Sequence, residues 1–277
     1  MKYKNKVKEK EEFILPKTRK EQLKDILKND FSLLVDISLL DLLFSLPLYL
    51  LFFLQFKFLL ALEELTFNKA FPIVFYLGLV AIILFALKGL AKGASYALLQ
   101  KRIFNEGFII IPTFFKQIKY NFTSYFFSYL ILGFSYFLTS SLILYFIYLN
   151  ANSFVKGLGI GVLLLGFLIC YISTQYFLNL TNVYELSFFQ GMKNAYSFTL
   201  ISFPTSILFF IFIVLLPFYL FTLSYVVIGI AIGIYILFYN GFSMLVFSLY
   251  SVFKFDTYIN KENFPSYYKR GLLKEDK

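Results

Sequence analysis

Long apolar runs separated by short charged stretches dominate the chain. A helix crosses a bilayer with about 20 mostly apolar residues. Six runs meet that length, at 39–62, 71–90, 122–149, 158–178, 198–216 and 223–247. The last two form one continuous apolar stretch, which we divide at Pro217 because proline disfavours a continuing helix. The pattern predicts an all-α polytopic membrane protein with six transmembrane helices.

A short amphipathic pattern precedes the first, third and fifth runs. "LKDILKNDF" (23–31), "FFKQIKYNF" (114–122) and "FFQGMKNAY" (188–196) each carry an apolar residue at every fourth position and lysine on the other side, as a helix lying in the membrane interface does. The apolar positions are Leu23, Leu27, Phe31; Phe114, Ile118, Phe122; Phe188, Met192, Tyr196. Pro112 suits the first turn of the second helix and Ser187 the cap of the third.

This arrangement divides the chain into three similar units. Each unit has an interfacial amphipathic helix followed by a transmembrane hairpin, and the units cover 18–107, 108–183 and 184–253 of a single membrane domain. Charged tails at 1–17 and 254–277 flank this domain.

The positive charges indicate the orientation of the spans. Of the 26 lysine and arginine residues, 23 lie in the two tails and the loops on one side. The loops on the other side contain three, at Lys57, Lys69 and Lys156. Because positive residues remain on the cytoplasmic side, we expect both termini and all three amphipathic helices to be cytoplasmic in a multi-pass protein of a bacterial cell membrane.

Composition changes the range of possible functions. The chain is 59% hydrophobic and 15% charged, which is typical of a membrane protein. Its net charge of +10 then favours anionic lipid headgroups over nucleic acid as the partner. There is no histidine and one cysteine, Cys170, so histidine-based catalytic triads and cysteine metal sites are excluded. "GLGIGVLLLG" lacks the strand before a nucleotide-binding loop. We expect no enzyme activity and no cofactor.

Four charges next to the first hairpin are the candidate polar site. Asp36 and Asp41 open the first span, and Lys88 and Lys92 close the second, so all four lie at its cytoplasmic end. Charges in apolar surroundings are usually paired or functional. We favour an ion pair that locks the hairpin, or lysines extended to headgroups, over a proton or ion relay.

Milder polar residues and small residues recur in the later spans. We expect Gln175, Asn179, Asn182 and Asn240 to form hydrogen bonds between helices, with a polar cavity as the alternative. Glycines four residues apart permit close helix packing within one subunit or in a homo-oligomer. They are Gly89 and Gly93, Gly157 and Gly161, and Gly229 and Gly233.

Two stretches resemble the YesL-like family of bacterial membrane proteins. One is "LLQKRIFNEGFIIIPTFFKQIKYNFTSYFFSYLILG", and the other is "SFFQGMKNAYSFTLISFPTSILFF". The similarity covers about residues 20 to 250, with a departure from the family pattern at Ser202, Phe203 and Pro204. The family has no known function, and its members resemble accessory proteins of carbohydrate-uptake systems, so the resemblance implies such an association.

Three functions remain compatible with the sequence. We favour an accessory or scaffold protein that docks a membrane transporter or its ATPase subunit on its basic cytoplasmic face. The candidate contacts with that partner or with headgroups are Lys101, Arg102, Lys116, Lys119 and Lys193. The alternative is a transporter or permease subunit carrying a small solute. A lipid-modifying enzyme is least compatible because histidine is absent and carboxylates within the membrane are few.

Overall fold

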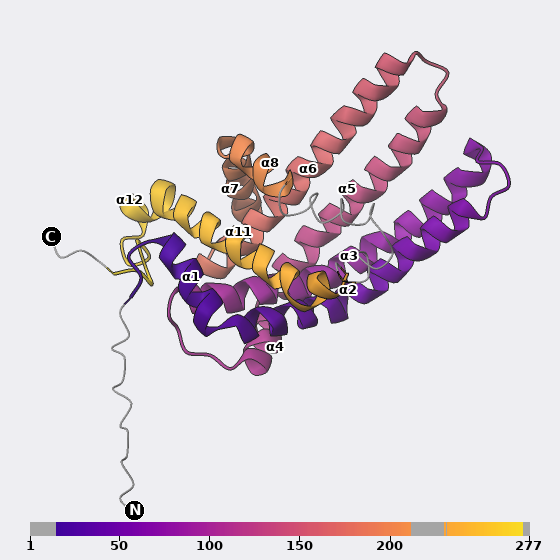
Figure 1. Ribbon diagram of the computed structural model, residues 1–277. Helices are drawn as coiled ribbons and strands as arrows, with labels where there is room; N and C mark the ends of the chain where they lie inside the picture. The colour runs from indigo at the N-terminus through magenta and orange to yellow at the C-terminus, as the bar shows by residue number, and fades with distance from the viewer. Residues whose placement is uncertain (1–14, 212–229, 231, 274–277) are drawn as a thin grey trace, which may run out of the picture.

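The computed structural model describes residues 15–211, 230 and 232–273. In these ranges every regular element is a helix (Figure 1). The elements are α1 (Arg19–Asn29), α2 (Phe31–Leu60), α3 (Phe67–Ile103), α4 (Ile110–Tyr120), α5 (Phe122–Tyr148), α6 (Ser153–Val183), α7 (Phe188–Ile201), α8 (Phe203–Phe210), the π-helices η2 (Tyr235–Tyr239) and η3 (Asp256–Asn260), α11 (Asn240–Phe255) and α12 (Lys261–Asn263).

Five helices are long and apolar enough to cross a membrane. They are Phe31–Leu60, Phe67–Ile103, Phe122–Tyr148, Ser153–Val183 and the continuous segment Ile232–Asn263. The prediction of an all-α, multi-pass membrane protein is therefore confirmed. The fifth predicted span, 198–216, contains the end of α7 and all of α8 and then leaves the described residues, as does the division at Pro217.

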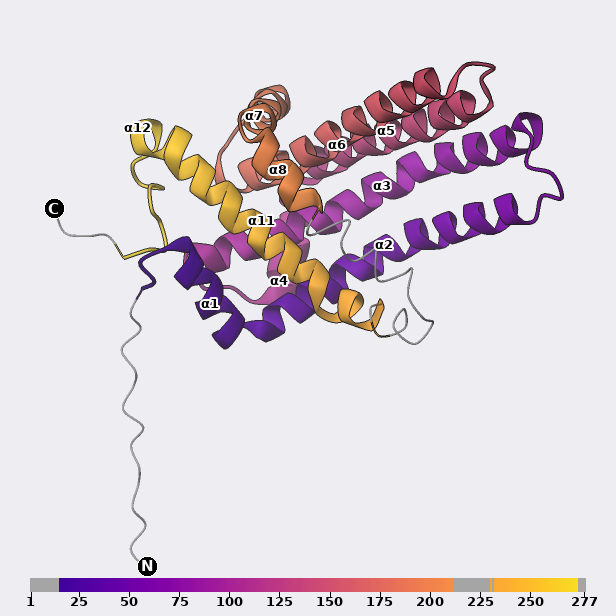
Figure 2. The ribbon, with the colours of Figure 1, turned by 45° about the horizontal axis from the view of Figure 1, so that its top comes forward.

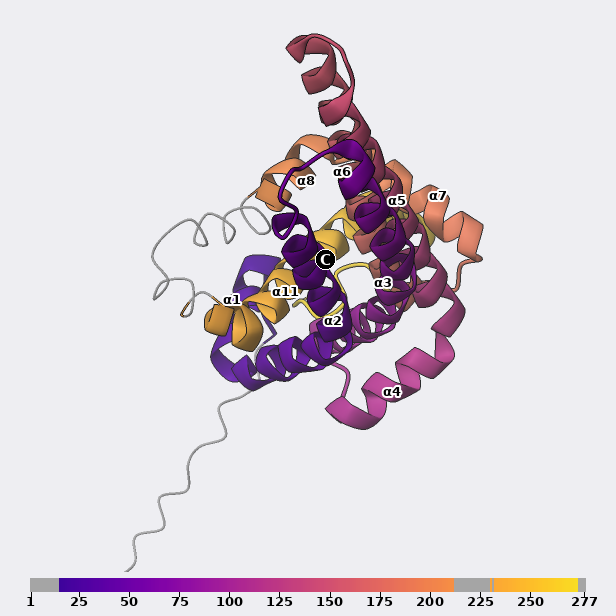
Figure 3. The ribbon, with the colours of Figure 1, turned by 90° about the vertical axis from the view of Figure 1, so that its right-hand side faces the viewer.

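The helices form a closed end and two arms. We call the part of the molecule that contains α1, α4, α7 and α12 the closed end. The hairpin turns at 61–66 and 149–152 lie at the opposite end and form the tips of the arms α2–α3 and α5–α6 (Figure 1). Figure 3, which looks onto the tips, shows the α5–α6 turn standing apart from the α2–α3 turn. The three short helices therefore share one end of the molecule.

Each short helix joins the next helix through a single non-helical residue. Asp30, Asn121 and Ser202 have φ/ψ of −129°/34°, −109°/24° and −103°/15°. Phenylalanine follows at each of these elbows. The polar side chain of Ser187 accepts a hydrogen bond from the Gln190 amide and begins α7, and Pro112 lies in the first turn of α4, as the sequence predicts.

The third unit differs in register from the sequence alignment. Its elbow lies at Ser202, so Ala195 and Thr199 occupy the positions of Phe114 and Ile118, and both are fully buried. Tyr196, which the sequence assigns to the apolar stripe, is 50% exposed. The helix α7 has 14 residues where α1 and α4 have 11, and this extra length hides the correct alignment.

The second half of α3 lies at the centre of the closed end. Every residue from Gly89 to Gln100 is buried, and α3 contacts α2, α4, α5, α6 and α11. Figure 2 shows α11 crossing this region of α2 and α3. By contrast, residues 153–171 of α6 contain no buried residue. The molecule thus combines a tightly packed end with arms whose apolar surface is open.

Glycine permits the close approach of α3 and α5. A Cβ atom at Gly93 would lie 2.3 Å from Tyr125 Cγ, and one at Gly89 would lie 2.4 Å from Tyr129 Cβ. The predicted packing role of this pair is confirmed. Gly157 and Gly161 have no neighbouring atom within 4 Å of that position, and Gly233 has none either, while Gly229 lies outside the described residues.

The C-terminal segment is part of the fold. The sequence predicts a charged tail from residue 254, but the helix continues through η3 and α12 to Asn263. Leu272 is buried, and the Leu273 amide donates to the Pro16 carbonyl at 2.9 Å. The segment packs against the fold through apolar side chains that lie between its charged residues, such as Leu272. The high density of charge makes these side chains difficult to recognise in the sequence.

Replacing Gly93 with leucine should destabilise the protein, because the new side chain overlaps Tyr125. Overpacking of this kind typically costs about 1–3 kcal/mol. Unfolding by sodium dodecyl sulphate, followed by circular dichroism, measures the loss. Gly161→Leu is the matched control and should unfold as wild type does, since its surroundings are open. Equal stability of the two variants would contradict the packing described here.

Candidate functional site

A buried ion pair connects α2 and α3 and is completed by α11. Lys92 Nζ lies 3.5 Å from Asp41 Oδ2, and their side chains are 8% and 1% exposed. Asn240 bridges the two charges: its amide nitrogen donates to Asp41 Oδ2 at 2.7 Å, and its oxygen accepts from Lys92 Nζ at 2.8 Å. We call Asp41, Lys92 and Asn240 the buried triad.

Local structure places Asn240 within reach of both charges. It follows η2, where five residues adopt π-helical geometry at the start of α11. Such bulges in helices are frequent at functional sites. At the next residue, the Gly241 amide donates to Ser38 Oγ at 2.8 Å, and a Cβ at Gly241 would lie 2.3 Å from the Leu34 carbonyl oxygen. This close crossing brings α11 against α2.

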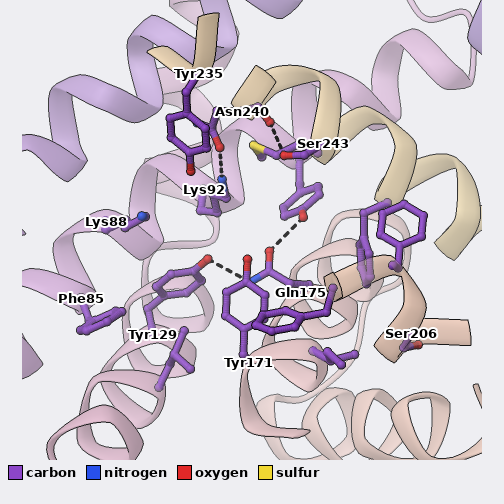
Figure 4. A pocket seen from close by; sticks show the side chains of 17 residues that line it. Phe85, Lys88, Lys92, Tyr129, Tyr171, Gln175, Ser206, Tyr235, Asn240 and Ser243 are labelled. Atoms are coloured by element: carbon purple, nitrogen blue, oxygen red, sulfur yellow. Dashed lines mark hydrogen bonds between the residues drawn. The ribbon is translucent and has the colours of Figure 1, made fainter. Parts of the chain in front are cut away.

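A cavity of about 130 Å³ lies beside the triad. Figure 4 shows Lys88, Tyr171 and Tyr235 around it together with Lys92 and Asn240. Helices α3, α5, α6, α8, α11 and η2 contribute to its lining. A water molecule occupies about 30 Å³ of liquid volume, so the cavity is large enough for a few waters or one small solute.

A ladder of amide and tyrosine side chains continues from the cavity into the closed end. Gln175, Asn179 and Asn182 lie on one face of α6, three or four residues apart. Gln175 accepts from Tyr96 at 2.9 Å and donates to Tyr129 at 3.1 Å. Gln100 and Ser248 donate hydrogen bonds to the side-chain oxygen of Asn179, at 2.7 and 3.0 Å. Asn182 donates to the Gly93 carbonyl at 3.1 Å and accepts from the Tyr125 hydroxyl. The predicted hydrogen bonds between helices are confirmed.

The structure separates the four predicted charges of the first hairpin. It brings together Asp41 and Lys92 only. The side chain of Asp36 makes no hydrogen bond or ion pair with any residue that the structure describes. Lys88 donates to the Tyr49 hydroxyl at 3.3 Å and lies over that ring, 4.9 Å from its centre. Among the described residues no carboxylate lies within 4.0 Å of Lys88. Lys88 therefore lines the cavity without an ion-pair partner among the described residues.

Two of the five predicted surface contacts are engaged within the molecule. Arg102 pairs with Asp30 at 2.6 Å and with Asp25 at 2.9 Å, which fastens α3 to α1. Lys101 pairs with Glu106 at 2.8 Å. By contrast, Lys116, Lys119 and Lys193 are exposed. Arg102 thus stabilises the closed end, and only the exposed lysines are open to a partner or to headgroups.

A second ion pair joins the two ends of the described chain. Arg19 lies 2.9 Å from Asp256, with side chains 10% and 11% exposed, and also donates to the Arg270 carbonyl. Burial lowers the pKa of Arg19, and the hydrogen bond and charge of Asp256 oppose that change. Gln22 donates to the Ile103 carbonyl at 2.7 Å. These contacts hold α1 against α3 and the C-terminal segment.

The groups that line the cavity are suited to binding a polar solute. No group of three or more histidine, cysteine or carboxylate side chains within the described ranges is placed to hold a metal ion. Asp41 and Lys92 neutralise each other. The cavity instead presents an ammonium group, tyrosine rings and amide groups, which suit a small polar or anionic solute.

Breaking the buried triad should destabilise the protein. Asp41→Asn or Lys92→Met alone leaves a buried charge without its partner, which costs about 3–5 kcal/mol. Each should lower abundance in the membrane and the free energy of unfolding, whereas the double variant should recover most of both because no lone charge remains. Asp36→Asn is the control and should behave as wild type. Unchanged stability of both single variants would contradict a structural role for the pair.

Comparison of the chain with protein-family models, curated proteins and solved structures finds no match. The geometry of the described residues therefore carries the functional argument.

Proposed function

We propose that the protein is an accessory or scaffold subunit of a bacterial cell membrane that docks another membrane protein. In this proposal it crosses the membrane six times, as three hairpins that follow α1, α4 and α7, with both termini in the cytoplasm. Two observations support this orientation. Of its 26 lysine and arginine residues, 23 fall on one side in the six-span scheme, and the three short helices lie opposite the hairpin turns (Figure 1).

The first half of α6 is the surface that carries the proposal. No residue from 153 to 171 is buried, although the next nine residues of this helix, 172–180, are all buried. Gly157, Gly161 and Gly166 have no atom within 4 Å of a Cβ position. Glycines four residues apart allow another transmembrane helix to approach closely. We therefore assign this face of α6 to contact with the partner.

The polar groups of the closed end support the same function. The ladder from Gln175 to Asn182 is engaged in hydrogen bonds between helices, so it rigidifies the platform from which the arms extend. Exposed Lys116, Lys119 and Lys193 are suited to contact anionic headgroups at this end. The resemblance to YesL-like proteins adds a carbohydrate-uptake transporter as the class of partner.

Photocrosslinking in native membranes tests the proposed surface. A benzophenone amino acid at Leu158 or Val162, which are 56% and 61% exposed on α6, should yield one adduct of defined mass. The same group at Leu43 of α2, which is 67% exposed, is the control and should react with lipid only. Gly161→Leu should reduce the adduct about ten-fold, because a bulky side chain at a packed interface costs about 1.4 kcal/mol or more.

Absence of an adduct at both α6 positions, or the same adduct from Leu43, would contradict docking through α6. Mass spectrometry of the adduct identifies the partner and shows whether it is a transporter, its ATPase subunit or a second copy of this chain.

Transport of a small solute is the second candidate, favoured by the positive charge of Lys88 beside the cavity. If the cavity is a transport site, the purified protein in liposomes should carry a small anion such as chloride or phosphate. Lys88→Gln should then abolish the flux while stability is unchanged, and Lys156→Gln, in the α5–α6 arm, should leave it intact. Flux by the chain alone with this pattern would replace the accessory function.

A further inference from the structure

A second and larger hollow lies on the outside of the closed end. It has a volume of about 930 Å³ and is formed by the start of α1, by α8, by α11 with η3 and α12, and by the C-terminal segment. We call it the α1–α11 groove. It is separate from the cavity beside the triad, with which it shares only Phe209 among its lining residues.

The floor of the groove is apolar. Six aliphatic or phenylalanine side chains from four parts of the chain line it: Leu23, Phe209, Val246, Leu249, Phe253 and Leu272. Phe253 is 54% exposed at this floor. Apolar surface is unfavourable in contact with water, so the groove is suited to a hydrocarbon chain.

The rim of the groove is positively charged. It includes four exposed lysines, Lys17, Lys20, Lys261 and Lys269. Within the described part of the chain, none of these ammonium groups pairs with a carboxylate within 4.0 Å. Asp256 is the carboxylate of the lining, and Arg19 already pairs with it at 2.9 Å. The rim thus has four positive charges that are available to an anion from outside the fold.

The length of the groove matches one leaflet of a bilayer. From Val246 to Lys261 there are 15 helical steps, which span roughly 22 Å. Half of the hydrocarbon core is about 15 Å thick, which leaves space for a headgroup at the lysine end. Val246 belongs to the segment Ile232–Asn263 that is apolar enough to cross the membrane, so the apolar end of the groove is continuous with a membrane-facing helix.

From this combination we propose that the α1–α11 groove binds an anionic phospholipid. The acyl chain lies along Val246, Leu249 and Phe253, and the phosphate contacts Lys17, Lys20, Lys261 and Lys269. Basic pockets at the cytoplasmic ends of transmembrane helices bind phospholipid headgroups in this manner. The bound lipid would connect α1 to α12 and to the C-terminal segment, which the Arg19–Asp256 pair already joins.

The chain contains no tryptophan, so a single tryptophan becomes a specific reporter. We would introduce Phe253→Trp into the protein and reconstitute it in nanodiscs that contain brominated phosphatidylglycerol or brominated phosphatidylcholine, each over the same series of mole fractions. Bromine quenches tryptophan only at close range. Each basic residue near the membrane surface strengthens anionic-lipid binding about five-fold. Phosphatidylglycerol should therefore quench at a mole fraction at least about ten-fold lower than phosphatidylcholine.

A charge-matched pair of variants identifies the site. With Lys17, Lys20, Lys261 and Lys269 all replaced by glutamine, the preference for phosphatidylglycerol should disappear. The control replaces Lys24, Lys28, Lys57 and Lys69, which are exposed and lie outside the groove, and should retain the preference. All eight side chains are at the surface, so both variants should fold, which circular dichroism verifies.

Three results would overturn the proposal. The first is equal quenching by the two lipids in the wild-type background. The second is an equal loss of preference in both lysine variants, which would indicate a general effect of charge. The third is a tryptophan that neither lipid quenches, which would show that protein covers the groove. None of these results bears on docking through α6, so the two proposals are tested independently.

Discussion

The complete burial of α3 from Gly89 to Gln100 is the constraint on which the closed end depends. A polar group in the enclosed stretch from Gly89 to Gln100 is stabilised by a hydrogen-bond partner, because an unsatisfied group in an apolar interior costs several kcal/mol. Ser95 Oγ and Gln100 Oε1 have no such partner among the described residues. Lys92, Tyr96 and Gln100 obtain partners from α2, α6 and α11. The positions of those helices relative to α3 are therefore fixed by hydrogen bonds as well as by packing.

Glycine residues in the same stretch of α3 permit the close packing that these hydrogen bonds need. Gly89 and Gly93 allow Tyr129 and Tyr125 of α5 to lie directly against α3, and those same tyrosines then reach Gln175 and Asn182 of α6. Small residues on one helix thus position large polar residues on the next. In a bilayer, where apolar side chains gain little by leaving lipid for protein, close packing and hydrogen bonds of this kind supply much of the association energy.

Much of the fold could be predicted from the sequence because membrane spans depend on local hydropathy. The helices and the three short amphipathic segments follow from local patterns along the chain. The pairing of Asp41 with Lys92 follows from the positions of charges within one hairpin. Asn240 lies 199 residues from Asp41, so its bridging role depends on how α11 crosses α2 and has no local signal. The sequence pattern assigns the wrong register to α7, because apolar residues are so frequent in this chain that several registers place one at every fourth position.

The roles of the surface residues likewise depend on contacts between distant segments and could not be predicted from the sequence. Arg102 is indistinguishable in sequence from a lipid-facing or partner-facing cation, but in the structure Asp25 and Asp30 of α1 occupy its guanidinium. The lysines of the α1–α11 groove come from opposite ends of the chain, at 17 and 20 and at 261 and 269. Their convergence depends on the folding of the C-terminal segment, which the high charge of residues 254–277 obscures.

The contact between Pro16 and Leu273 has a consequence for biosynthesis. The hairpins can enter the membrane one after another as the ribosome produces them, but Arg19 and Gln22 meet Asp256, Arg270 and Gly271 only after residue 271 has emerged. The first helix must wait at the membrane surface for the last segment to arrive. A ribosome that stops early therefore leaves a nascent product in which α1 lacks these partners.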